Sequence, residues 1–204
     1  MSRTGRRPAE GGTAWGKAAL VALPAVAAVA AMSVGMAEGV LASSFAVSGK
    51  AFQVSSGRLS SKGLVSFVDV ARAADGEGRP GALLGIGDAR LSDICQSARI
   101  DTPVGTVVFK LTAGGKAGQV TVRNLVLHSQ DLAGDAEFGD VQIGRDASTL
   151  DRVPGIRGEP GRFGLQAADV TVTGVKSHAW SATGGDFRLK GLSLDVSLDG
   201  RTCF

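Results

Sequence analysis

Apolar and polar residues alternate with a period of two in several short stretches of the second half of the chain. The clearest stretches are residues 106–112, 120–123, 170–172 and 192–199. In the last of these, every even position is Leu or Val and every odd position is Ser or Asp. Such alternation predicts strands with one buried and one solvated face. Beyond residue 38 no long stretch shows the 3.6-residue period of an amphipathic helix.

The alternation changes phase in two places. Apolar positions are odd in residues 187–189 and even in 192–198, with Gly191 between them, and a second change lies between Val122 and Leu125. A one-residue shift within a strand is what a β-bulge produces, and bulges curve sheets. The pattern therefore predicts a mainly β domain, built as a strongly curved antiparallel sheet or as a sandwich-like fold.

Residues 18–37 form a different kind of segment, with 20 consecutive uncharged and mostly apolar residues. As a helix this segment would be about 30 Å long, which matches the hydrocarbon core of a bilayer. Four basic residues and one acidic residue precede it, and Glu38 follows it. This charge asymmetry predicts a single transmembrane helix with a cytoplasmic N-terminus and an extracytoplasmic C-terminal domain.

A cleavable signal peptide is the alternative interpretation, because small residues follow the apolar run between Ala42 and Ala46. Cleavage would release the domain as a secreted protein. The expected organisation is a cytoplasmic basic N-terminus at 1–17, the transmembrane helix or signal h-region at 18–37, a juxtamembrane segment at 38–50, and the exported β-domain at 51–204 with a Gly/Pro-rich loop at 152–164.

Charge and composition exclude several classes of function. The chain of 204 residues has a net charge of +3, and the first 17 residues carry all of it as four basic residues against one acidic residue. The remainder, with 18 basic and 18 acidic residues, is neutral and gives no reason to expect nucleic-acid binding. Two Cys and two His are too few for most zinc or iron sites, so we expect no metal and no cofactor.

The two cysteines, Cys95 and Cys203, form an even pair in a domain that is expected outside the cytoplasm. Disulfides persist in that environment, so we predict a bond between them. Two separate buried thiols are the alternative.

A search for catalytic motifs finds no G-x-S-x-G elbow, H-E-x-x-H or C-x-x-C sequence. His128 and His178 each end an apparent strand, with Ser129 and Ser177 beside them in sequence. Either histidine could act as a general base, but sequence neighbours rarely form a working dyad. We therefore assign no catalytic residue.

One apolar face of the curved sheet is a candidate groove for acyl chains if no second layer covers it. The residues predicted to line it are Phe109, Leu111, Phe187, Leu189, Leu192, Leu194 and Val196. The alternative is that these side chains form an ordinary closed core.

Several ordered blocks resemble an uncharacterised family from Streptomyces and related actinobacteria. The blocks are Gly39–Gly49, Ile94–Ser97, Thr102–Val107, Leu111–Gly114, Ile143–Asp151, Phe163–Ala167 and the Cys203–Phe204 terminus. The resemblance implies a short membrane-anchored protein without an established activity, in a family that often carries the automatic label of cholesterol esterase. It also implies a small polytopic membrane protein as a partner. The family offers no catalytic motif to transfer to this chain.

These observations lead to a functional hypothesis. We expect a non-enzymatic, membrane-anchored protein of the cell envelope that binds a lipid or assembles with a membrane partner. The alternative is a secreted hydrolase that resembles lipid or cholesterol esterases. The sequence leaves the ligand and the oligomeric state open.

Overall fold

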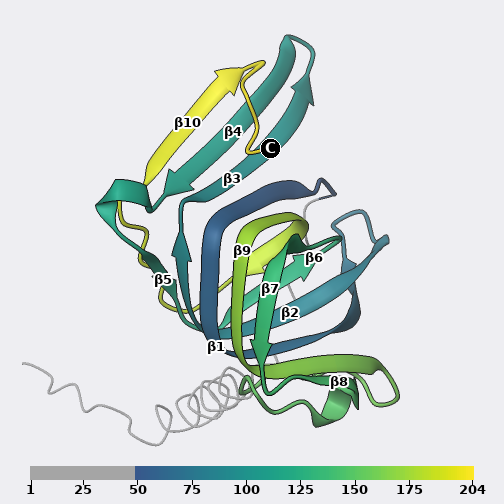
Figure 1. The fold of residues 1–204 in the computed structure, drawn as a ribbon. Coiled ribbons are helices and arrows are strands. Elements are labelled where there is room, and N and C mark those ends of the chain that lie inside the picture. The colour runs from purple at the N-terminus through teal and green to yellow at the C-terminus, as the bar shows by residue number, and fades with distance from the viewer. Residues whose placement is uncertain (1–48) are drawn as a thin grey trace, which may run out of the picture. The chain divides into compact units, whose positions relative to one another are not determined.

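The computed structural model describes residues 49–204, in which antiparallel strands predominate and the only helices are two short 3-10 helices (Figure 1). The expectation of a mainly β antiparallel domain is confirmed. The elements of this part of the chain are β1 (Phe52–Arg72), β2 (Gly78–Ser92), β3 (Ile94–Thr102), β4 (Gly105–Ala113), the 3-10 helix η2 (Gly115–Ala117), β5 (Val120–Val122), β6 (Leu125–Ser129), β7 (Ala133–Gly139), β8 (Gln142–Asp146), the 3-10 helix η3 (Ala147–Thr149), β9 (Phe163–Thr183) and β10 (Ser193–Leu198).

The N-terminal expectations concern residues that the structure does not describe. The basic segment 1–17, the predicted transmembrane helix 18–37 and the juxtamembrane segment 38–50, except for its last two residues, lie outside the described residues. Within 49–204, no helix has the length and apolar character needed to cross a membrane.

Four strands close into a ring. β1 pairs with β2, β2 pairs with β6, β6 pairs with the end of β9, and β9 pairs with β1. β1 and β9 each contain 21 residues, and Figure 1 shows both as long, strongly bent ribbons. β7 and β8 pair with β9, and β5 pairs with β2. A single sheet therefore curls until its pairings return to the starting strand, and we call this unit the ring.

Two glycines within the long strands have left-handed backbone conformations. Gly63 in β1 has a φ of 81° and Gly174 in β9 has a φ of 63°, values that glycine adopts without a Cβ penalty. On β9 the buried valines change from even to odd numbers across Gly174, so the same face stays inward on both sides of it. Asn124, with a φ of 49°, separates β5 from β6 at the predicted phase change.

The second predicted phase change has a different cause. We expected residues 187–198 to form one bulged strand, and this is wrong. β10 begins at Ser193, and residues 187–189 lie in the preceding connection, where Arg188 forms an isolated bridge with Thr121. Gly191, with a φ of 64°, lies in the turn that ends this connection and is not part of a β-bulge. Apolar residues before and after this turn therefore gave the sequence pattern expected of one continuous strand.

Three strands project from the ring, and we call them the wing: β3, β4 and β10 (Figure 1). β3 is attached to the start of β1 through residues 95–97 and 53–55. β4 pairs with β3 along its whole length, and β10 pairs with β4 as the outer strand.

The outside of the ring is covered by the connection between β8 and β9. Val65 and Phe67 of β1 pack there against Ala147, Leu150 and Val153 in a second, smaller core. The Gly/Pro-rich segment 152–164 is irregular as far as residue 162 and then enters β9. The predicted Gly/Pro-rich loop is thus anchored at its start by buried Val153.

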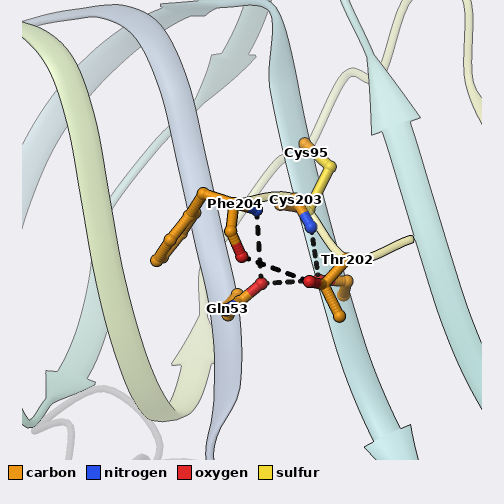
Figure 2. The surroundings of a disulfide bond; sticks show 6 residues. Gln53, Cys95, Thr202, Cys203 and Phe204 are labelled. Atoms are coloured by element: carbon orange, nitrogen blue, oxygen red, sulfur yellow. Dashed lines mark hydrogen bonds between the residues drawn. A yellow bond between two sulfur atoms is a disulfide. The ribbon is translucent and has the colours of Figure 1, made fainter.

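The predicted disulfide is present, and it joins Cys95 of β3 to Cys203 (Figure 2). The backbone N–H of Cys203 donates to Ser97 Oγ at 3.0 Å, and that of Phe204 donates to Gln53 Oε1 at 3.4 Å. The C-terminal tail therefore fastens the wing to β1 of the ring.

Candidate functional site

An apolar cavity of about 300 Å³ lies inside the ring. Strands β1, β2, β6 and β9 contribute its innermost wall, which is aliphatic and largely buried. The residues of that wall are Leu59, Leu64, Leu84, Ile86, Leu125, Leu127, Val170, Val172 and Val175. None of the side chains that line the cavity is charged. The ring therefore encloses a space suited to a hydrocarbon group.

The cavity reaches the surface beside β7 and the connection that follows β9. Leu132, Phe138 and Phe187 line the cavity, yet each of these residues remains between 43% and 48% exposed. Ala133, Gly134 and Ala136 complete this side of the wall. We call this opening, framed by Leu132, Phe138 and Phe187, the mouth.

Three polar side chains also line the cavity, and two of them are hydrogen-bonded within the protein. The hydroxyl of Ser56 donates to the carbonyl of Ser92 at 2.6 Å, and that of Ser177 donates to the carbonyl of Asp131 at 2.8 Å. The side-chain amide of Gln96 has no hydrogen-bond partner within residues 49–204. Gln96 is therefore the polar residue of the cavity wall whose side-chain hydrogen-bonding groups are available to a ligand.

The cavity wall continues onto the wing. Val54 of β1 pairs with Gln96 of β3, which pairs with Leu111 of β4, which pairs with Leu194 of β10. Residues directly opposite each other in antiparallel strands project from the same face of the sheet. Val54 and Gln96 line the cavity, so the face that bounds it is also the face that carries Leu111 and Leu194.

This side of the sheet, the apolar wing face, is uncharged and partly open to solvent. Ile100, Leu194, Val196 and Leu198 are each more than half exposed. Apart from Gln96, its residues are Ile94, Ala98, Ile100, Val107, Phe109, Leu111, Leu194, Val196 and Leu198. Contiguous exposed apolar surface of this kind marks ligand, membrane or protein contacts.

The opposite face of the wing is polar and is covered in part by the C-terminal tail. Arg99, Lys110 and Asp195 project from that side, and Val108 between them is buried beneath Gly200. The tail thus covers one face of the wing and leaves the apolar wing face uncovered by the described chain.

The residues of the predicted groove are divided between two surfaces. Phe109, Leu111, Leu194 and Val196 lie together on the apolar wing face. Phe187 frames the mouth of the cavity.

The remaining two predicted groove residues lie elsewhere. Leu192 precedes β10 and is exposed, and Leu189 packs against the main core. Sequence reasoning missed the innermost cavity wall. The apolar residues Leu84, Ile86, Leu125 and Leu127 could have marked buried strands there, but not a ligand site.

His178 is paired with a carboxylate rather than with a serine. Its Nδ1 lies 2.8 Å from Asp131 Oδ2, and its backbone N–H donates to Asp131 Oδ1 at 2.7 Å. Partial burial raises the pKa of Asp131, but the two hydrogen bonds from His178 and the attraction of its ring together lower that pKa below its ordinary value.

The neighbouring serines do not form a dyad with His178. Ser177 and His178 are consecutive on β9, so their side chains project from opposite faces. The hydroxyls of Ser129 and Ser177 contact each other, and both donate to the carbonyl of Asp131. These hydroxyls stabilise the turn after β6 and show no activation by a base.

His128 is buried on the outside of the ring. Its Nε2 lies 3.9 Å from Asp69 Oδ2, and neither ring nitrogen forms a hydrogen bond within the described part of the chain. No serine hydroxyl is paired with it there. Residues 49–204 also contain no group of three or more His, Cys, Asp or Glu side chains placed to hold a metal ion.

Fold and site together define a β-protein with an apolar, charge-free cavity and a projecting apolar wing. A family model described as a family of unknown function, DUF6230, matches residues 48–204. Since this match spans most of the chain, the protein belongs to that family, and the expectation of an uncharacterised family is confirmed. Comparison with curated proteins and with solved structures finds no match.

Proposed function

We propose that this protein binds the hydrocarbon chain of a lipid inside the ring and has no catalytic activity of its own. The cavity of about 300 Å³ carries the proposal, because it is charge-free and open at a mouth framed by exposed apolar side chains. The volume lies at the lower end of the range of about 300–1,000 Å³ that is usual for ligand sites, which favours one alkyl chain.

Burial of an alkyl chain supplies enough free energy for reversible binding. Each methylene group transferred from water contributes about 0.8 kcal/mol, so ten groups contribute roughly 8 kcal/mol before the entropy cost of association. The net affinity is then micromolar to millimolar, since those dissociation constants correspond to about 8 and 4 kcal/mol. Such affinity suits a protein that collects and releases a lipid.

The proposal includes a location at the cell membrane of an actinobacterium. Residues 18–37 would anchor the chain with its N-terminus in the cytoplasm, and their uncharged length and basic flank support this arrangement. The disulfide between Cys95 and Cys203 supports export, because such bonds are rare in the cytoplasm. Cleavage after the apolar run would give a secreted form of the same lipid-binding domain.

The apolar wing face is the route to the cavity in this proposal. It joins the cavity wall at Val54 and Gln96, so a chain leaving a membrane would stay in contact with apolar side chains. An assembly with a polytopic membrane protein would place a lipid source beside the wing. The esterase alternative has less support, because within residues 49–204 neither histidine ring is hydrogen-bonded to a serine hydroxyl.

The test is photolabelling of the full chain in phospholipid vesicles with a long-chain alkanol that carries a diazirine on its alkyl chain. Labelled peptides are identified by mass spectrometry. We expect labels on β6 and β9 at residues that face the cavity, such as Leu127 and Val172. Native mass spectrometry of protein extracted from its own host in mild detergent would show the natural lipid and whether residues 1–42 remain.

Two variants of β7 provide a matched comparison. Ala136→Trp places a large ring in the wall near the mouth, whereas Glu137→Trp places the same ring on the opposite face of the strand. We expect Ala136→Trp to reduce cavity labelling at least fivefold and Glu137→Trp to leave it unchanged. Equal labelling of the two variants, or labels confined to exposed surface, would contradict the proposal.

A further inference from the structure

The polarity of the cavity restricts the class of lipid that it accepts. No Lys, Arg, His, Asp or Glu side chain lines it, so a charged head group would find no counter-ion there. Moving an ionised group out of water into such surroundings is very costly. The site therefore discriminates against fatty-acid anions and quaternary ammonium lipids whose head groups must enter it.

The cavity wall contains one polar side chain with unused hydrogen-bonding groups, that of Gln96. It lines the cavity at the point where the ring wall passes into the apolar wing face, between Val54 and Leu111 in the cross-strand row. Its side-chain amide carries both donors and an acceptor, and none of them is used within the described chain. By contrast, the hydroxyls of Ser56 and Ser177 already donate to backbone carbonyls.

We infer that the ligand is an uncharged single-chain amphiphile whose polar group hydrogen-bonds to Gln96 while its alkyl chain extends toward Leu84 and Leu127. The polar group belongs to the class that an amide recognises: an alcohol, an ester or an amide. This inference rests on the proposed function and adds the chemical class of the ligand and its orientation.

The orientation follows from the distribution of polar atoms. The wall formed by β2 and β6 presents aliphatic side chains, including Leu84, Ile86, Leu125 and Leu127, and offers nothing that a polar group could bind. An alcohol or ester placed there would lose its hydrogen bonds to water without replacement, which is unfavourable. At Gln96 the same group gains an amide partner, and the alkyl chain fills the aliphatic end.

The experiment compares four photoreactive probes with the same alkyl chain on the full-length protein in phospholipid vesicles. Their head groups are a methyl group, a hydroxyl, a carboxylate and a trimethylammonium. We expect the hydroxyl probe to label the cavity residues roughly five- to tenfold more strongly than the methyl probe, a ratio typical of one net hydrogen bond. The two charged probes should label these residues least.

Variants at Gln96 connect this preference to the side chain. Gln96→Leu should abolish the preference for the hydroxyl probe and leave labelling by the methyl probe intact, while Gln96→Asn should retain part of the preference. Thr112→Val, on the opposite face of the wing, is the matched control because it also removes one hydrogen-bonding group. It should leave the preference unchanged.

The outcomes separate two possible failures. If no probe labels the cavity, the proposed function itself is wrong. If the methyl and hydroxyl probes label it equally in the natural sequence, or the carboxylate probe labels it as strongly as the hydroxyl probe, the inferred ligand class is wrong while lipid binding stands. Retention of the hydroxyl preference in a folded Gln96→Leu protein would overturn the role of Gln96. The comparison of probes on the natural sequence holds even if a variant fails to fold.

Discussion

Cys203 is bonded to Cys95 across 108 positions of the sequence, and this bond holds the C-terminal tail against the polar face of the wing. The residue after it, Phe204, places its ring edge-on to His178 of β9, with the ring centroids 5.3 Å apart. The tail therefore contacts β1, β3 and β9, which belong to both the wing and the ring. The disulfide thus fixes the tail to the wing, and the non-covalent contacts of Phe204 with Gln53 and His178 join the tail to the ring.

Removal of the disulfide should lower the stability substantially. A closed loop of this length restricts the unfolded chain by an amount worth about 4 to 5 kcal/mol in the chain-entropy estimate. The double variant Cys95→Ala/Cys203→Ala should lose about 2 to 5 kcal/mol of unfolding free energy in a urea titration. The reduced natural protein is the matched control and should show a similar loss. A loss below about 1 kcal/mol in both would show that the tail contacts suffice without the bond.

Gly63 and Gly76 offer a test of how closely the loop at Arg152 packs on β1. Both have a similar positive φ, 81° and 85°. A Cβ on Gly63 would lie 2.6 Å from the carbonyl oxygen of Arg152, whereas a Cβ on Gly76 would meet nothing within 4 Å. Gly76→Ala reports the backbone strain alone, about 1–2 kcal/mol. Gly63→Ala should cost a further 1–3 kcal/mol or so, as is typical of overpacking.

The measurement is thermal or urea unfolding of both alanine variants beside the natural protein. Equal destabilisation of the two would mean that the loop at Arg152 moves aside without cost. It would then not be a fixed cover of the ring.

Several features of the fold follow from short stretches of sequence, and these features could be predicted. The Leu/Val and Ser/Asp alternation from Leu192 to Asp199 gives β10, and the even pair of cysteines gives the disulfide. Asn124 lies at a phase change that the sequence displays directly. Each of these features depends on neighbouring residues or on residue type alone.

The ring was not predictable in the same way. β1 and β9 pair although their partners lie far apart in the sequence, for example Leu59 with Val172. Gly63 and Gly174 shift the alternation within these long strands, so that each appears in the sequence as shorter, unrelated pieces. Because the cavity exists only once the ring has closed, its walls at Leu84 and Leu127 carry no local signal of a ligand site.

The pairing of Asp131 with His178 should make stability depend on pH in the acidic range. The pKa of Asp131 is lowered in the folded protein, so its ionised form stabilises the fold at pH values above its unfolded pKa near 4. This contribution is lost as the pH falls through the lower folded pKa. Since both side chains are substantially exposed, solvent screening limits the contribution to about 1 kcal/mol or less.

Asp131→Asn should therefore reduce the unfolding free energy at pH 7 and have little effect near pH 2. Urea titrations at the two pH values measure the difference. Asp135→Asn is the control, because this carboxylate on β7 forms no hydrogen bond within residues 49–204. A deficit of equal size at both pH values would show that the asparagine acts through packing rather than through lost charge.

Replacement of valine by alanine should change the unfolding free energy by different amounts on the two faces of the wing. Val108 of β4 is 1% exposed beneath the tail, and Val196 of β10 is 60% exposed on the apolar wing face. Val108→Ala removes buried methyl groups and leaves a cavity, so it should lower the unfolding free energy by about 2 kcal/mol. Val196→Ala should change it by less than about 0.5 kcal/mol, as is usual for exposed positions.

Substitutions at the same two positions separate stability from lipid uptake. Because Val196 lies on the proposed route to the cavity, Val196→Asp should slow photolabelling of the cavity from vesicles several-fold while leaving the urea midpoint unchanged. Val108→Ala should do the reverse, with a lower midpoint and an unchanged labelling rate in the folded fraction. If Val196→Ala destabilised the protein as strongly as Val108→Ala, the apolar wing face would be a covered core, and it could not be the route by which a lipid reaches Gln96.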